Sequence, residues 1–280
     1  MQVNYINCNS YDNSYKYNNR TTDFKARSTK VLKENGDIAY RTLSNFYRAD
    51  LNWRRFVDYI INKYKNVDKV NIINHACSAG YETYSLLMLL INTLGEENCK
   101  KFFPIIARDV DNDVIKYAKK GKLEATPAEY GFAYNFGSVF QSHYYKEDIF
   151  NDYCKVSRLK KPSNYDDLKD DDCGANEYLI SFYPKLKNYI NFQQSDVFND
   201  KDLINKENTI LLLRNVWPYF GDDGIDKLID FLAKNMKKSS LLVIGNFDIK
   251  GHVDEKLMNR GFKDTLYHKF YEHQIFEPPN

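Results

Sequence analysis

The sequence has no long hydrophobic run, few cysteines and almost no net charge, and each of these absences excludes a class of protein. The longest apolar runs, within residues 85–92 and 209–213, fall far short of the roughly 18 residues that a membrane span requires, and no secretory signal opens the chain. Five cysteines with no CxxC pair argue against a disulfide framework or a zinc site. Forty basic and 38 acidic residues leave a net charge of +2, which gives no reason to expect a nucleic-acid partner. We therefore expect a cytoplasmic protein with no metal, no nucleic-acid partner and no membrane insertion.

Strands alternate with helices along most of the 280 residues. Apolar or β-branched runs at 70–74, 102–107, 209–213 and 241–245 are separated by helical patterns that include 82–94, 111–120 and 222–237. This alternation predicts βαβ units and a mostly parallel sheet. The sequence therefore predicts an α/β, Rossmann-like fold, in which strand-like pieces between 265 and 276 add an antiparallel C-terminal edge strand.

The predicted organisation is one domain with an N-terminal extension and an insertion. Residues 1–42 begin with an Asn- and Tyr-rich stretch without apolar periodicity, so we expect a partly disordered extension. Residues 43–280 form the predicted domain, which opens with a helical pattern over 43–64. Residues 121–195 interrupt the alternation and are predicted to form a small inserted subdomain.

The loops that follow the first two predicted strands contain the first candidate binding residues. An open parallel sheet binds its ligand at the carboxyl ends of its strands. There the chain places Ala76, Ser78 and Gly80 in a small-residue loop, Glu82 in the next helical turn, and Asp109 at the second strand tip. A carboxylate in that position can accept both hydroxyls of a ribose. The ordinary alternative is a tight turn and a solvated aspartate.

The type of ligand follows from two missing motifs. Neither the GxGxxG fingerprint nor a GxxxxGK[ST] loop occurs, so nothing in the sequence holds phosphates. S-adenosyl-L-methionine has a ribose, an adenine and an amino-acid end but no phosphate, and it fits this pattern. Arg214 and Asn215 add polar groups at the tip of the leucine-rich strand 209–213, and Arg48 lies beside two aromatic residues. For Arg48 alone, a long side chain lying along a helix surface is the simpler alternative.

In their order, these segments resemble motifs of the CheR-type chemotaxis receptor methyltransferases. The aromatic pair, arginine and acidic residue of that family resemble residues 46–50, FYRAD, and its glycine loop is similar to residues 76–85, ACSAGYETYS. Its strand-tip motif is similar to residues 107–111, ARDVD, and its Arg-Asn motif to residues 213–220, LRNVWPYF. A weaker match, FQQSDV at 192–197, lies where the family lines the adenine. The resemblance covers about residues 43–280 and implies a class I methyltransferase fold that uses S-adenosyl-L-methionine.

The chain departs from the family at identifiable positions. Ala76 replaces the first glycine of the loop, Tyr81 replaces a glutamate and Thr83 replaces a proline. The helical N-terminal domain of the family is not recognisable in residues 1–42. The substitutions in the loop concern the predicted cofactor pocket, and the N-terminal difference concerns the predicted acceptor.

The resemblance implies a role for each matching residue. Positioning of the acceptor and catalysis fall to Arg48, Arg214 and Tyr219. Cofactor binding falls to Ala76, Ser78, Gly80, Glu82, Asp109, Asp196, Val197, Arg214 and Asn215. Three of these residues have structural alternatives: Asp109 as a helix N-cap, Glu82 as a partner of a helix dipole, and Tyr219 as a core aromatic.

The sequence therefore predicts a methyltransferase that transfers a methyl group from S-adenosyl-L-methionine to a glutamate carboxylate. The expected partner is an acceptor protein with an exposed glutamate, similar to a chemoreceptor. Two alternatives are a methyltransferase of the same fold with a small-molecule acceptor, and a catalytically degenerate module that binds a cofactor or a protein.

Overall fold

Seven strands form the main sheet of the computed structural model, which describes residues 44, 46–48, 50–125, 130, 152–163, 176–265 and 274–279. The strand order is β6-β2-β1-β7-β8-β10-β9. The strands are β1 (Asn71–His75), β2 (Ile105–Asp109), β6 (Ile190–Gln194), β7 (Thr209–Leu213), β8 (Leu241–Val243), β9 (Lys263–Asp264) and β10 (Ile275–Glu277). The first five in the order pair in parallel, whereas β10 is antiparallel to both β8 and β9. The predicted Rossmann-like α/β architecture with an antiparallel C-terminal edge is confirmed, and the predicted extension 1–42 lies outside the described residues.

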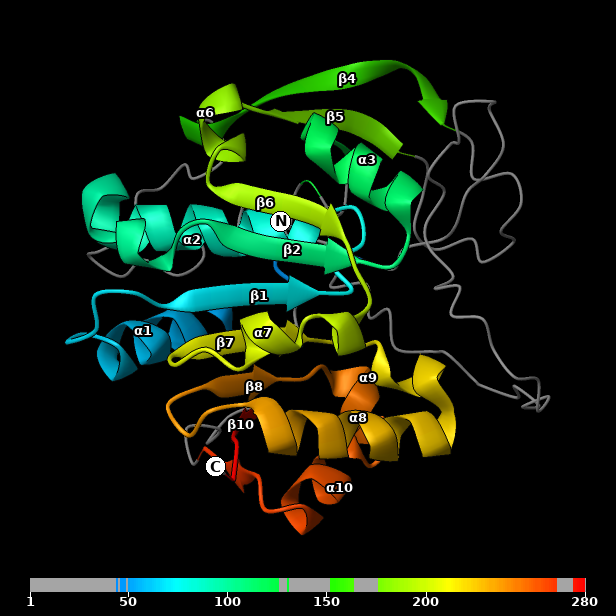
Figure 1. The fold of residues 1–280 in the computed structure, drawn as a ribbon. Helices are drawn as coiled ribbons and strands as arrows, with labels where there is room; N and C mark the ends of the chain where they lie inside the picture. The colour runs from blue at the N-terminus through cyan, green and yellow to red at the C-terminus, as the bar shows by residue number, and fades with distance from the viewer. Residues whose placement is uncertain are drawn as a thin grey trace, which may run out of the picture.

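Helices cover both faces of this sheet (Figure 1). One core contains residues of α1 (Trp53–Lys63), α2 (Tyr81–Asn98) and α3 (Asn112–Lys120), and the other contains residues of α7 (Lys201–Ile204), α8 (Gly221–Asn235) and α10 (Val253–Asn259). Successive strand residues alternate between the two cores: Ile72 belongs to the first and Ile73 to the second. Because both faces are buried, β7 is an uninterrupted apolar run, as its sequence suggests.

Helix α2 is buried on all sides over its first three turns. Every residue from 81 to 91 is buried, because the sheet covers one side and other segments cover the rest. The ring of Phe46 lies 4.9 Å from that of Tyr81, and Tyr84 stacks on Phe182 at 3.9 Å. The backbone N–H of Tyr47 donates to Ser85 Oγ at 3.0 Å. The apolar run at 85–92 is therefore a buried helix of the core.

A second, antiparallel sheet has the order β3-β5-β4 and lies beyond β6 at the edge of the main sheet (Figure 1). Its strands are β3 (Lys122–Ala125), β4 (Cys154–Ser163) and β5 (Asn176–Phe182), followed by the short α6 (Pro184–Lys187). The predicted insertion, 121–195, is too long at its C-terminal end, because β6 pairs with β2 in the main sheet. The boundary was predicted too late because β6 alternates buried and exposed residues, a pattern that fits an edge strand of a small sheet as well as one of the main sheet.

The first predicted helix is shorter than the pattern over 43–64 suggested. Helix α1 begins at Trp53, and Asn52 Oδ1 caps it by accepting the N–H of Arg55. The described residues before it form turns, in which Leu51 N–H donates to Arg48 O. Phe46 and Leu51 are buried by docking on the core, so their apolar character is not helical periodicity. None of the helices in the described part of the chain is long and apolar enough to cross a bilayer.

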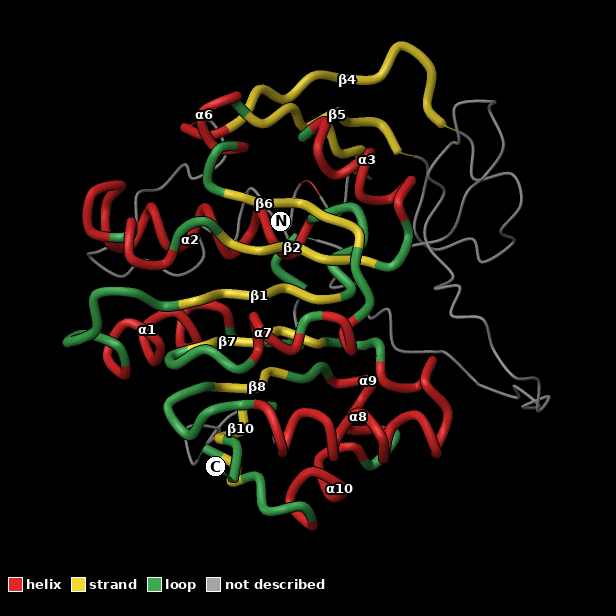
Figure 2. The backbone as a smooth tube through the Cα atoms, in the orientation of Figure 1, coloured by secondary structure: helices red, strands yellow, loops and turns green. Residues whose placement is uncertain are grey.

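The parallel strands end at a common edge, as the tube in Figure 2 shows. The loops after β1, β2, β6 and β7 leave the sheet there, and short helical turns follow two of them: η2 (Val197–Asn199) and η3 (Trp217–Phe220). Helix α9 (Asn246–Lys250) follows β8 at the same edge. This edge is therefore the place to look for a site.

Candidate active site

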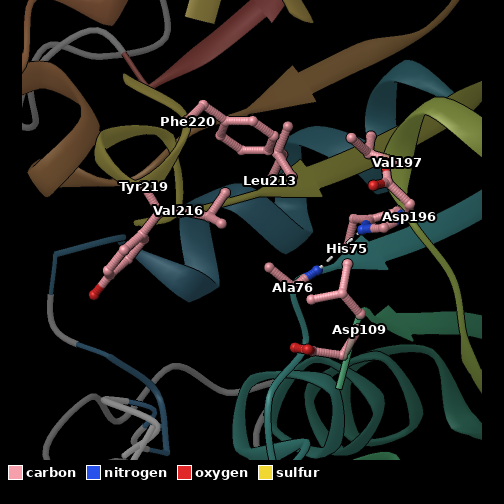
Figure 3. A pocket seen from close by; sticks show the side chains of 10 residues that line it. His75, Ala76, Asp109, Asp196, Val197, Leu213, Val216, Tyr219 and Phe220 are labelled. Carbon is pink, nitrogen blue, oxygen red and sulfur yellow. Dashed lines mark hydrogen bonds between the residues drawn. The ribbon is translucent and has the colours of Figure 1, made fainter. Parts of the chain in front are cut away.

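A cleft opens at the carboxyl ends of the strands (Figure 3). Its volume, which includes the part open to solvent, is about 450 Å³. Ten residues line it: His75, Ala76, Asp109, Val110, Asp196, Val197, Leu213, Val216, Tyr219 and Phe220. Five of the predicted site residues are among them: Ala76, Asp109, Asp196, Val197 and Tyr219. Tyr219 keeps 40% of its surface exposed, so its interpretation as a core aromatic is wrong.

The loop between β1 and α2 has an unusual backbone. Ala76, Ser78 and Gly80 all have a positive φ, of 56°, 52° and 90°. At Gly80 the φ of 90° disfavours any side chain, and a Cβ would lie 3.0 Å from the ring of Phe192, which would then have to shift by a few tenths of an ångström. Ser78 Oγ is buried and has no hydrogen-bond partner among the described residues. Ser78 itself is not among the residues that line the cleft.

Asp109 holds this loop and lines the cleft at once. Its Oδ2 accepts the N–H of Ser78 at 2.8 Å and its Oδ1 accepts the N–H of Asp111 at 3.0 Å. Burial raises the pKa of Asp109, and the two backbone donors oppose this shift. The N-cap of α3 is Asp111, which accepts from Asp113 and Val114, so the N-cap alternative for Asp109 is wrong. Each carboxylate oxygen has a second lone pair that a ligand hydroxyl can use.

Two other predicted residues, Glu82 and Arg214, meet Asp50 in a buried charge network. Arg214 Nη1 donates to Glu82 Oε2 at 2.5 Å and Nη2 donates to Asp50 Oδ1 at 2.7 Å, and the Arg214 side chain is only 1% exposed. The guanidinium lies 5.2 Å from the ring centre of Trp53. Burial raises the pKa of Asp50, but Arg214 and Arg48 lower it more strongly, so the net direction is downward. Glu82 and Arg214 are therefore bound to each other and do not line the cleft described above.

Asn215 also directs its side chain toward the protein. Its Nδ2 donates to Asp50 Oδ2 at 3.3 Å and its Oδ1 accepts the N–H of Phe247 at 3.0 Å. The side chain packs so closely on Gly245 that a Cβ at that position would overlap it. Asn215 thus connects β7 to the loop between β8 and α9.

Asp196 and Val197 lie at the turn after β6. Asp196 Oδ1 accepts the N–H of Phe198 at 2.9 Å and caps η2, and its side chain reaches the wall of the cleft. Val197 is buried and gives the cleft an apolar contact. The backbone N–H of Ser195 donates to Asp109 O, so this turn is held against the tip of β2.

The sequence analysis missed a second cluster, centred on Asp200. Its Oδ2 lies 2.9 Å from His75 Nε2, and its Oδ1 accepts from Ser195 Oγ at 2.9 Å and lies 3.4 Å from Arg108 Nη1. His75 Nδ1 accepts the N–H of Ala76 at 3.2 Å, which assigns the ring proton to Nε2. Burial raises the pKa of Asp200, but its bonds to His75 and Ser195 lower it, and the net direction is downward. A histidine at a strand tip was a visible signal, whereas its partner lies 125 positions away.

The comparisons with known proteins agree with this geometry. Residues 42–131, about a third of the chain, match the family described as CheR methyltransferase, SAM binding domain. The CheR-type resemblance is confirmed. The matched region includes the loop of Ala76, Ser78 and Gly80 together with Asp109. Because this family domain binds S-adenosyl-L-methionine, the predicted cofactor is confirmed at the level of the CheR-type domain.

Curated relatives extend the CheR-type likeness beyond that domain at low identity. A chemotaxis protein methyltransferase of Listeria monocytogenes is 20% identical over 205 residues, 72% of this chain and 63% of the relative. One of Borreliella burgdorferi is 23% identical over 185 residues, 66% of this chain and 54% of the relative. The matched part is thus less than two thirds of either relative.

A solved structure was also compared. A S-adenosylmethionine-dependent methyltransferase from Clostridium acetobutylicum is 15% identical with a TM-score of 0.30, over 70% of this chain and 51% of that one. At that score the likeness carries no argument about this fold.

Replacing Ala76 by glycine should stabilise the protein. A left-handed backbone costs a residue with a side chain about 1–2 kcal/mol, and part of this is offset by the greater freedom of glycine in the unfolded chain. We expect Ala76→Gly to raise the free energy of unfolding by about 0.5–1 kcal/mol in urea denaturation. The matched control is Ala79→Gly in the same loop, where φ is not positive and the methyl is buried, so stability should fall. Equal effects of the two changes would contradict the backbone argument.

Removing the charge of Arg214 should destabilise the protein strongly. Arg214→Met leaves Glu82 and Asp50 without the guanidinium to which both are hydrogen-bonded, which costs about 3–5 kcal/mol for a buried pair. Urea denaturation measures the loss, and Arg260→Met is the matched control. Arg260 is exposed and pairs with Asp230 at 2.8 Å on the surface, so its loss should cost about 1 kcal/mol or less. A loss of that small size at Arg214 would show that the buried network contributes little.

Proposed function

We propose that the protein is an S-adenosyl-L-methionine-dependent methyltransferase of the CheR type that acts on glutamate carboxylates of a protein acceptor. The observation that carries the proposal is the cleft at the strand tips, where Asp109 faces the ligand space within the matched cofactor-binding region. The chemotaxis methyltransferase names of the relatives support the acceptor class.

The residues of the cleft fit the proposed cofactor. Asp109, which lines the cleft, offers two unused lone pairs for the ribose hydroxyls. Val197, Leu213 and Val216 give the cleft apolar walls on which a flat adenine ring can pack. No basic group is needed in such a site, because the cofactor has no phosphate.

The proposed chemistry needs alignment and little else. S-adenosyl-L-methionine supplies an electrophilic methyl group on a sulfonium. A glutamate carboxylate has an ordinary pKa of about 4.3 and is already a nucleophile at neutral pH, so no general base is required. The protein then contributes orientation and exclusion of water. We assign the ribose to Asp109, the mouth of the cleft to Tyr219, and the approach of the acceptor carboxylate to Arg48.

Arg214 and Glu82 take an indirect part in this proposal. Arg214 spends both terminal nitrogens on Glu82 and Asp50, so we assign it to holding the first turn of α2 and the segment around Asp50 in place. Asn215 acts in the same way on the next loop. These residues position the site and do not touch the acceptor.

A protein acceptor is favoured over a small molecule by the exposure of Tyr219 at the cleft. We propose a receptor-like protein with exposed glutamates, met in the cytoplasm. The degenerate alternative arose from the substitutions in the glycine loop. It is disfavoured because Ala76 keeps a left-handed backbone and Asp109 still binds the loop.

Asp109 provides the first test of the cofactor site. In titration calorimetry, S-adenosylhomocysteine should bind the unmodified protein, and Asp109→Asn should weaken binding by about tenfold or more, as expected for loss of charged hydrogen bonds. Asp111→Asn is the matched control, because it removes the same charge two residues away and asparagine is an equally good N-cap. Its affinity should stay within about twofold of the original. Absence of binding to the folded, unmodified protein would overturn the proposed function.

Tyr219 provides a test of the reaction. Methyl groups transferred from radiolabelled S-adenosyl-L-methionine to acceptor proteins should be released as methanol in mild alkali, as an ester requires. Tyr219→Phe should lower the transfer rate by about threefold to tenfold, as expected for the loss of one hydrogen bond, while S-adenosylhomocysteine binding is retained. Tyr183→Phe, which changes another exposed tyrosine, should leave the rate unchanged. Label that resists alkali would exclude a carboxylate acceptor.

A further inference from the structure

A buried carboxylate lies behind the loop that carries Tyr219. Asp248, in α9, has no exposed surface. Its Oδ2 accepts the N–H of Gly245 at 2.7 Å and that of Asn215 at 2.6 Å, and its Oδ1 accepts the N–H of Trp217 at 3.1 Å. Asp248 therefore bonds to the backbone of two different loops, and it does not line the cleft.

The two loops cap each other. While Asp248 binds the backbone of residues 215 and 217, the side chain of Asn215 accepts the N–H of Phe247 in the first turn of α9. Asn215 has a φ of 57°, a left-handed conformation that asparagine adopts more readily than most residues because its short polar side chain can hydrogen-bond locally. The reciprocal bonds hold this conformation in place. They fix the chain just before η3 begins.

This fixed segment leads directly into the cleft. Val216 lines the cleft, and its carbonyl accepts the N–H of Tyr219 at 3.0 Å. Trp217 Nε1 donates to Leu213 O at 2.8 Å, so the turn is also held against the end of β7. The backbone position of Tyr219 thus depends on the segment that Asp248 binds.

The carboxyl group of Asp248 changes its protonation state near neutral pH. Burial raises its pKa to about 7, and the three backbone N–H donors and Arg214 oppose this shift. Arg214, which directly follows β7, is the cation near Asp248. Asp50 is the neighbouring acidic group, and it accepts hydrogen bonds from Asn215 Nδ2 and the N–H of Asn246. Both oxygens of the ionised carboxylate are hydrogen-bond acceptors, which suits the three N–H groups that donate to them. Protonation makes one oxygen a donor, which no longer suits an adjacent N–H.

We propose that Asp248 is a positioning residue for the cleft: its ionised carboxylate holds the backbone from Asn215 to Trp217, and protonation loosens this segment together with Val216 and Tyr219. The effect on the loop stands on the contacts of Asp248 together with its raised pKa. The effect on methyl transfer rests on the proposed function.

The chain has two tryptophans, Trp53 and Trp217, which permits a direct test. In protein labelled with 5-fluorotryptophan, the ¹⁹F resonance of Trp217, assigned with Trp53→Phe, should shift with pH with a midpoint near 7. Asp248→Asn should abolish this titration. Asp254→Asn, which changes another buried aspartate, should retain it. A Trp217 resonance that does not move between pH 5.5 and 8.5 in the folded protein, or that titrates equally in Asp248→Asn, would overturn the proposal.

The consequence for the reaction is measured separately. The methyl-transfer rate should fall as the pH is lowered through 7, and this dependence should be absent in Asp248→Asn, whereas the affinity for S-adenosylhomocysteine should change by less than about threefold. A rate profile that is the same in both proteins would contradict the functional part. If Trp217 titrates but S-adenosylhomocysteine does not bind, the positioning of the loop stands and the proposed function fails.

Discussion

The guanidinium of Arg214 is the charge on which the site depends. It is almost completely buried, between Glu82 and Asp50 and next to the Trp53 ring. Removing ions from water costs several kcal/mol each, and only close, well-directed partners compensate for it. Those partners come from the first turn of α2 and from the segment before α1. One interaction therefore fixes three parts of the chain at the same edge of the sheet.

The loops around the cleft are held by a related construction, in which a carboxylate side chain binds groups of a neighbouring loop. Asp109 binds the loop after β1, and Asp248 binds the loop after β7. Asp200 connects His75 of β1 with Ser195 after β6. Loops at strand ends lack the backbone partners that a sheet provides, so polar side chains replace them. The cleft is consequently rigid where the cofactor is proposed to bind and exposed where Tyr219 lies.

Local sequence patterns predicted most helices and strands, but they did not predict contacts between residues far apart in the sequence. The strand 209–213 was predicted with its observed bounds, because an apolar run that is buried on both faces is unambiguous. The helix over 43–64 was predicted too long, since Phe46 and Leu51 are buried by turns that dock on the core. Glu82 and Arg214 were predicted as site residues, but their mutual bond spans 132 positions and leaves no periodic pattern in the sequence. Asp248 was missed for the same reason.

The altered glycine loop and the unpredicted histidine are best understood together. Ala76 replaces the glycine expected from the family, yet its backbone stays left-handed, with a φ of 56°. The N–H of Ala76 donates to His75 Nδ1, and Nε2 of the same ring binds Asp200. A neutral imidazole with its proton on Nε2 can make both bonds at once. The left-handed backbone at Ala76 is thus bonded to a neighbour outside the motif, and Asp109 binds the same loop at Ser78.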